Sequence, residues 1–256
     1  MAQVELNTLQ LGNNGHPLVM LHGWGQNLQS LQPLGELLAT KSNVHIIDLP
    51  GFGKSAPPPA DWDTTQYADR IYQYLDERGI ERADMVAHSV GGRISIRLAH
   101  QYPDRVRSMT LINAAGLKRQ RTLQQSLRSQ WVSTIRNTFK LSPLYRDELL
   151  TWHSQKYGSR DYLNAGALKG TFIKVVNEDL TELAKQIPVP VLLLWGEKDT
   201  ETPVEMGYRY HSLFPNSELI TIPNRDHFMF QGEGSHLCAY YIEKFLARLS
   251  SPVLAL

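Results

Sequence analysis

The chain has 256 residues, of which 42% are hydrophobic, and its net charge is +1. This length fits one catalytic domain with a sizeable core, and the small net charge gives no electrostatic basis for binding nucleic acid. No apolar run approaches the ~20 residues of a membrane helix, and a single cysteine with no signal-peptide pattern at the start predicts a cytoplasmic protein.

Short apolar segments alternate with segments of helical periodicity along most of the chain. The expected strands are 3–11, 17–21, 43–48, 83–88, 106–112, 190–195 and 218–222. The expected helices are 28–39, 64–78, 90–102, 203–214 and 235–249. This alternation predicts an α/β fold, with a mostly parallel central sheet and helices on both of its faces. Reactive loops are expected at the carboxyl ends of the strands.

One stretch, residues 117–184, interrupts the alternation. No strand of the core type is expected there, and apolar residues recur at helical spacing. We interpret it as a helical cap inserted into a core formed by residues 1–116 and 185–256. Several of its aromatic residues either line an apolar pocket or pack the cap onto the core: Trp131, Phe139, Tyr145, Trp152 and Phe172.

The expected cap is also more basic than the rest of the chain. It holds eleven lysines and arginines against six aspartates and glutamates, a balance of +5. Two interpretations remain open. The charge belongs to a solvated helix face, or it attracts an anionic small-molecule substrate through its long-range field.

The most informative segment surrounds Ser89, which lies between the expected strand 83–88 and the expected helix 90–102. A serine at a sharp strand-to-helix turn is typical of a nucleophile elbow, in which small neighbours allow the strand and helix to approach closely. Gly91 and Gly92 supply that space after the serine. Ala87 stands where the general pattern has glycine.

A serine hydroxyl needs a base to accept its proton and an acid to orient that base. In this architecture the chain order is serine, then acid, then histidine. Asp199 follows the expected strand 190–195, and His227 follows the expected strand 218–222, so the order is satisfied.

Other candidates for these roles are weaker. Glu197 lies nearer the strand than Asp199, and Asp226 is next to His227 in sequence, where side chains rarely face each other. The strand 106–112 ends in Asn113, so it supplies no alternative acid. His88 is interpreted as a packing residue rather than a second base.

Backbone donors for a developing negative charge are also expected. Glycines in the segment from His22 to Gly25 let the chain come close to a substrate, so the amide of Trp24 can point at the charge. The second donor is the amide of Val90, at the positive end of the elbow helix. We expect His22 to be a structural hydrogen-bonding residue of this loop.

Five segments in this order resemble the α/β-hydrolase family, and they cover essentially the whole expected core: 22–25, 48–55, the elbow around Ser89, 196–199 and 226–227. The resemblance is to small capped bacterial serine hydrolases, which include carboxylesterases, biotin-pathway methyl-ester hydrolases, proline iminopeptidases and carbon–carbon bond hydrolases. It implies Ser89 as nucleophile, His227 as base and Asp199 as orienting acid. It further implies Trp24 and Val90 as oxyanion donors.

These observations leave three functional hypotheses. The first is hydrolysis of a small or medium carboxylic ester through an acyl-enzyme on Ser89. The second keeps the same triad but cleaves an amide or a carbon–carbon bond, or performs an elimination. The third is a non-catalytic ligand-binding relative, for which an intact triad is unnecessary. No cofactor is implied, and no metal site, because Cys238 is the only cysteine and no histidine cluster has metal-ligand spacing.

Overall fold

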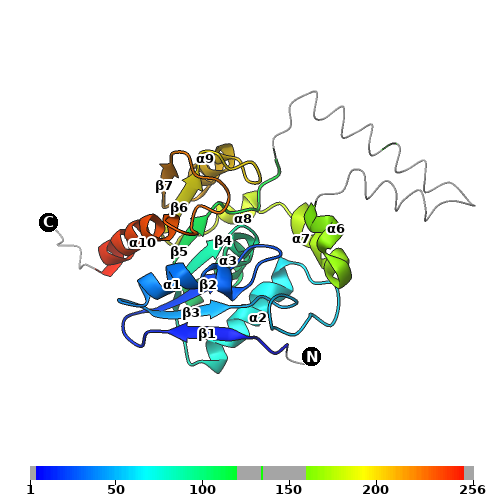
Figure 1. Cartoon of the computed structure of the whole chain (residues 1–256), viewed down its shortest axis with the longest axis horizontal. Helices are drawn as coiled ribbons and strands as arrows, with labels where there is room; N and C mark the ends of the chain where they lie inside the picture. The colour runs from blue at the N-terminus through cyan, green and yellow to red at the C-terminus, as the bar shows by residue number, and fades with distance from the viewer. Residues whose placement is uncertain (1–3, 120–133, 135–159, 251–256) are drawn as a thin grey trace, which may run out of the picture.

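A seven-stranded sheet forms the centre of the computed structural model, which describes residues 4–119, 134 and 160–250 (Figure 1). The strands are β1 (Thr8–Leu11), β2 (Pro17–Leu21), β3 (Asn43–Ile47), β4 (Ala83–His88), β5 (Val106–Ile112), β6 (Val191–Gly196) and β7 (Ser217–Ile222). They lie in the order β1-β3-β2-β4-β5-β6-β7. Only β1 runs antiparallel to its neighbour in this sheet of described strands, so the predicted mostly parallel sheet is confirmed.

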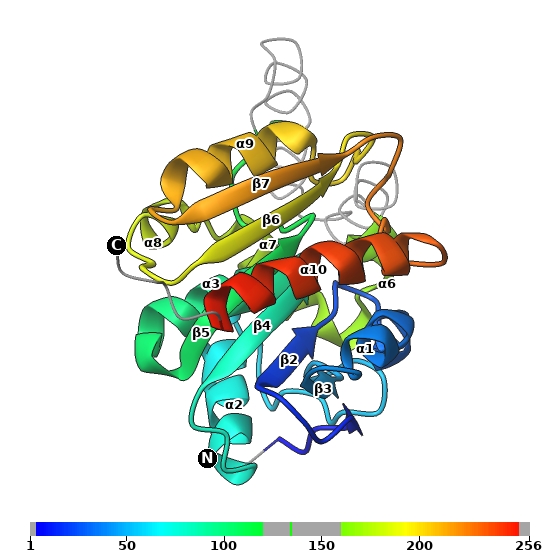
Figure 2. The same cartoon turned by 90° about the vertical axis from the view of Figure 1, so that its left-hand side faces the viewer.

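Helices cover both faces of the sheet, as predicted. One face packs against α1 (Gln32–Leu38) and α10 (Gly234–Ser250), the other against α2 (Thr64–Glu77), α3 (Val90–Gln101) and α9 (Val204–Leu213). Figure 2 shows α10 crossing the near face of the sheet, with α2 and α3 behind it. Successive strand residues alternate between the two cores, because side chains along a strand point to opposite faces.

The strand register brings the loops that carry the candidate site residues to one edge of the sheet. Leu21 at the end of β2 pairs with Ala87 of β4, and Ile112 at the end of β5 pairs with both His88 and Leu194. The segments that follow these parallel strands therefore emerge together at the carboxyl edge. This edge is where a parallel α/β sheet places its ligand sites.

Two expected elements are shorter in the structure. The strand expected at 3–11 begins at Thr8, because the Glu5 carbonyl accepts the Ala56 amide and Asn7 bonds to Asp48 and Ser55, in the loop after β3. The helix expected at 28–39 is divided into the 3-10 turn η1 (Leu28–Ser30) and α1, which has proline in its first turn.

The described part of the expected cap is helical. It comprises α6 (Arg160–Asn164), η3 (Gly166–Leu168), α7 (Lys169–Asn177) and α8 (Thr181–Ala184). The α7 helix lies over the loop after β3, where the Trp62 amide donates to Thr171 Oγ1 at 3.1 Å and Lys174 Nζ donates to the Asp61 carbonyl at 2.6 Å. The α8 helix packs against α3 and α9. None of the described helices has the length and apolarity needed to cross a membrane.

Candidate active site

Ser89 occupies the tight turn between β4 and α3. Its backbone angles, φ 49° and ψ −112°, are sparsely populated for a residue with a Cβ atom. The turn is packed closely against its neighbours, because a Cβ on Gly91 would lie 2.3 Å from the Leu21 carbonyl oxygen and one on Gly92 would lie 2.6 Å from Ala114 Cβ. Glycine is therefore required at both positions, for the reason that the elbow pattern predicts.

Asp199 and His227 lie together beyond β6 and β7. The Nδ1 atom of His227 is 2.7 Å from Asp199 Oδ2, and both side chains are buried. The carboxylate also accepts the amides of Glu201 and Thr202 through Oδ1, at 2.8 and 2.9 Å, and the Thr202 hydroxyl through Oδ2, at 2.7 Å. These hydrogen bonds, together with the contact to His227 Nδ1, hold the Asp199 carboxylate in one orientation, and they leave the Nε2 atom of His227 on the side of the ring away from Asp199.

The competing acids do not reach His227. Glu197 is exposed. Asp226 is also exposed, and its Oδ1 accepts the amide of Phe228 in its own loop. The structure thus brings Asp199, rather than either neighbour, to the imidazole.

The hydrogen bond expected between Ser89 and His227 is not formed in this structure. Within the described residues, Ser89 and His227 share no direct hydrogen bond, and His227 Nε2 lies 3.4 Å from Glu201 Oε2. The two segments are nevertheless adjacent, because the ring of His88, the residue before Ser89, lies 4.6 Å from the ring of His227. Hydrogen bonds between catalytic groups commonly tighten only when substrate is bound.

The two expected oxyanion donors come from neighbouring segments. Val90 is the first residue of α3, so its amide has no partner within the helix. The Trp24 loop begins beside this helix, because a Cβ on Gly91 would meet the carbonyl oxygens of Leu21 and His22. The Gly23 amide donates to Gln26 Oε1 at 2.9 Å, which holds the loop in shape.

His22 is the structural residue of that loop, as predicted. Its Nδ1 lies 2.7 Å from the Gly23 carbonyl, and its Nε2 accepts the Leu49 amide at 3.0 Å. Burial lowers the pKa of His22 to about 4, so the ring stays neutral and can accept that amide.

Asn113 connects the loop after β6, which carries Asp199, with the loop after β7, which carries His227. The sequence did not reveal this role. The side-chain amide of Asn113 donates to the carbonyls of Asp226 and His227 at 2.9 and 3.0 Å, and its Oδ1 accepts the Gly196 amide at 2.9 Å. The Thr202 hydroxyl oxygen, whose proton is directed to Asp199, also lies 3.0 Å from the Asn113 carbonyl oxygen. The φ of 45° at Asn113 is one that asparagine tolerates better than most residues, and an asparagine ending a strand is the one available signal.

His88 also supports the histidine loop. It packs between the rings of His227 and Phe230, and its Nε2 lies 2.9 Å from the His227 carbonyl. Burial, followed by the charge of His227, holds the pKa of His88 well below its usual range. A neutral ring at this place is a packing and hydrogen-bonding residue, not a second base.

Phe172 is the one expected pocket residue that the structure describes. It is buried on α7, and its ring lies 4.9 Å from the Trp24 ring, beside the expected oxyanion loop. The other expected pocket residues lie outside the described residues: Trp131, Phe139, Tyr145 and Trp152. Among the described residues, no three histidine, cysteine, aspartate or glutamate side chains are grouped so as to hold a metal ion.

The fold and the elbow define a class, and the comparisons agree with it. A family model described as "alpha/beta hydrolase fold" matches residues 16–162, and one described as "TAP-like protein" matches residues 173–254. The chain belongs to the α/β-hydrolase family, with an insertion region at residues 113–160. Its distant homologues include esterases, lipases and meta-cleavage carbon–carbon hydrolases.

Three similar proteins have different named activities. A pimeloyl-[acyl-carrier protein] methyl ester esterase of Vibrio cholerae is 26% identical, over 91% of this chain and 96% of its own length. A dihydrolipoyllysine-residue acetyltransferase component of the acetoin cleaving system of Pseudomonas putida is 29% identical over 93% of this chain, which spans only 65% of that protein. A bacterial membrane phospholipase A superposes with a TM-score of 0.77 at 22% identity, covering 98% of this chain and 85% of that one.

Proposed function

We propose that this α/β-hydrolase cleaves small or medium carboxylic esters through an acyl-enzyme on Ser89. The observation that carries the proposal is the buried pair of His227 Nδ1 and Asp199 Oδ2, 2.7 Å apart, next to a serine on a strained elbow. This arrangement supports the roles of nucleophile, base and orienting acid, with His227 Nε2, which lies 3.4 Å from Glu201 Oε2, as the atom that takes the proton.

In the proposed reaction, His227 Nε2 takes the proton of the Ser89 hydroxyl while Oγ bonds to the ester carbonyl carbon. The carbonyl oxygen becomes negatively charged, and the amides of Trp24 and Val90 donate hydrogen bonds to it. The bond to the alcohol oxygen then breaks, and the alcohol leaves with the proton held by His227. Water, deprotonated by His227, attacks the acyl group, releases the acid and restores Ser89.

An ester is favoured over a carbon–carbon bond by the relatives. The Vibrio cholerae relative that matches over almost its full length is named as a methyl ester esterase. The resemblance to a meta-cleavage product hydrolase of Pseudomonas fluorescens rests on a structure at 22% identity, which supports a shared fold but no shared reaction.

Replacement of the nucleophile tests the proposal. Ser89→Ala should lower kcat on a p-nitrophenyl ester by on the order of 10³-fold or more, and should abolish labelling by a fluorophosphonate probe. The circular dichroism spectrum should not change, because only one hydroxyl is removed. A variant that keeps most of the activity would exclude Ser89 as nucleophile, and a wild-type chain that neither reacts with the probe nor turns over esters would favour a non-catalytic relative.

We also propose the cytoplasm as the compartment of this protein. Its single cysteine, Cys238, is buried, and burial raises the pKa of the thiol to about 12. A neutral, buried thiol is a packing group and makes no demand for an oxidising compartment.

A further inference from the structure

A cavity of about 560 Å³ adjoins the candidate active site, on the side of the Asp199 loop. It is bounded by the chain that follows β5, the end of α7, the acid loop and α9, and its lining includes Ala115, Asn177, Thr202 and Met206. Two of these residues connect the cavity to the triad. The Ala115 amide donates to the Ser89 carbonyl at 3.1 Å, and the Thr202 hydroxyl donates to Asp199.

Arg93, one helical turn after Ser89, contributes a buried positive charge to this cavity. Only 6% of the residue is exposed. Its guanidinium donates to two backbone carbonyls, those of Glu178 at 2.9 Å and Val176 at 3.4 Å, while its Nε has no partner among the described residues. Among the described residues no carboxylate forms an ion pair with this guanidinium: the Glu178 carboxylate is bonded to Arg97 and Thr64, and the charges of Glu178 and Asp179 act on Arg93 only at longer range. A buried cation without a carboxylate in direct contact is costly, so an anion at this place would be stabilising.

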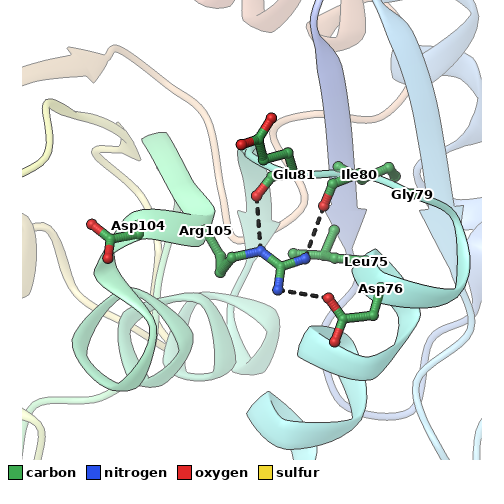
Figure 3. A pocket seen from close by; sticks show the side chains of 7 residues that line it. All are labelled: Leu75, Asp76, Gly79, Ile80, Glu81, Asp104 and Arg105. Carbon is green, nitrogen blue, oxygen red and sulfur yellow. Dashed lines mark hydrogen bonds and ion pairs between the residues drawn. The ribbon is translucent and has the colours of Figure 1, made fainter.

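Arg105 shows the contrasting arrangement at the opposite edge of the sheet (Figure 3). It lines another cavity, of about 490 Å³, and its guanidinium donates to the carbonyls of Ile80 and Glu81. It also forms an ion pair of 2.7 Å with Asp76. Because the carboxylate is supplied by the protein itself, that cavity gives no reason for a bound anion.

Two further cations line the cavity next to Ser89. Lys118 is exposed and only loosely paired with Asp179, at 3.7 Å, and exposed Arg119 donates to the Thr200 carbonyl at 2.7 Å. Glu201 is the one acid among the described lining residues, and its carboxylate lies against His227 Nε2. The lining therefore has three cations and one acid, and that acid is placed at the edge facing the triad.

We infer that this cavity binds a carboxylate group of the substrate, held by Arg93 with Lys118 and Arg119, while the ester group reacts at Ser89. This inference rests on the proposed esterase function and narrows it to esters that carry a free carboxylate, such as monoesters of dicarboxylic acids. A planar guanidinium matches a carboxylate geometrically, and the two outer cations increase the local concentration of anions.

Two matched esters test the assignment. p-Nitrophenyl pentanoate and mono-p-nitrophenyl glutarate have acyl chains of the same length, and only the second carries a carboxylate. The ratio of their kcat/KM values, glutarate over pentanoate, should fall about tenfold in Arg93→Gln and about threefold in Lys118→Gln. Lys185→Gln is the control, because it removes another exposed lysine, one that is paired with Glu182 at 2.7 Å and does not line the cavity. It should leave the ratio unchanged.

A ratio that does not change in Arg93→Gln and Lys118→Gln overturns the assignment. Should Arg93→Gln fail to fold, Lys118→Gln and Arg119→Gln decide the question. Calorimetric titration of glutarate into Ser89→Ala separates this inference from the proposed function, because binding requires no turnover. If the wild type cleaves neither ester, the esterase proposal fails, and the cavity is still supported by glutarate binding that weakens with Lys118→Gln. If glutarate does not bind, or binds equally well after Lys118→Gln, the proposal that the cavity binds a carboxylate is overturned as well.

Discussion

Asp199 is distinguished from nearby acids by its hydrogen bonds rather than by its position in sequence. Three donors from Glu201 and Thr202 hold its carboxylate against His227, whereas Glu197 points to solvent. A charge-assisted hydrogen bond to a buried imidazole is more stabilising than the same hydrogen bond at the surface, because little water competes for the buried groups.

Asp199→Asn should therefore lower kcat far more than Glu197→Gln or Asp226→Asn. The asparagine amide would donate to Nδ1 and favour the wrong tautomer of His227, with a loss on the order of 10⁴-fold by analogy with other triads. The two control variants should stay within about twofold of the wild type. Steady-state kinetics of the three proteins on one p-nitrophenyl ester measure this, and Glu197→Gln as the most damaging change would place the acid two residues earlier.

Asn113 should behave as a positioning residue. Asn113→Asp keeps the size and the positive φ, but puts a carboxylate oxygen opposite the carbonyls of Asp226 and His227. We expect kcat to fall about 10- to 100-fold with little change in KM, because the histidine loop shifts while the substrate contacts remain. A rise in KM at unchanged kcat would contradict this role, and Asn113→Gly, which retains the backbone conformation, should show a loss in the same direction.

Contacts between elements hold the loops at the carboxyl edge of the sheet. His22 joins the loop after β2 to the loop after β3, since its Nε2 accepts the Leu49 amide. The β4–α3 turn fits against the end of β2 only because Gly91 has no side chain. The position of each catalytic segment thus depends on the neighbour against which it packs.

The contact made by His22 predicts a specific loss of stability in acid. Its pKa is about 4 in the folded protein, against 6.5 in the unfolded chain, so between these values the unfolded state binds more protons. The contribution of His22 to the free energy of unfolding is therefore fully present above about pH 6.5. It should fall by up to about 1.4 kcal/mol per pH unit as the pH decreases toward 4. The lowered pKa of His88 acts in the same direction.

Urea denaturation at a series of pH values would measure this slope. His22→Gln is an informative comparison, because its side-chain oxygen can still accept the Leu49 amide but gains no proton. The variant should have a shallower decline between pH 6.5 and 4 than the wild type. Equal slopes would show that His22 does not titrate with the pKa that its burial implies.

At the scale of the whole molecule, parts of the expected cap lie over the site loops. Phe172 of α7 contacts Trp24, and a Cβ on Gly51 would lie 2.8 Å from the Leu168 side chain. The cap boundaries, 117 and 184, stay a prediction. We propose that this cover limits access to Ser89 to molecules that fit beneath it.

The chain should consequently prefer small or medium dissolved esters to emulsified triglycerides. Activity on p-nitrophenyl esters of increasing acyl length and on a long-chain triglyceride emulsion would measure the preference. Strong lipase activity would refute a covering cap. If the +5 balance of residues 117–184 contributes, kcat/KM for an anionic ester should fall with added salt more than for a neutral one, because screening shortens to about 8 Å near physiological ionic strength.

The sequence by itself determined the α/β class, the mostly parallel sheet and the approximate bounds of most core strands and helices, because these depend on the local period of hydrophobic residues. It also selected Asp199 and His227 through chain order, and it ranked Asp199 ahead of Glu197 and Asp226 through their positions in the two loops. Only the tertiary structure revealed that Asn113 and Thr202 support the loops after β6 and β7, and that Arg93 is a buried cation with no carboxylate in direct contact among the described residues. Those properties depend on which groups far apart in the chain meet at one edge of the sheet. A linear pattern of residue types contains no distances, so it cannot distinguish a paired arginine from an unpaired one.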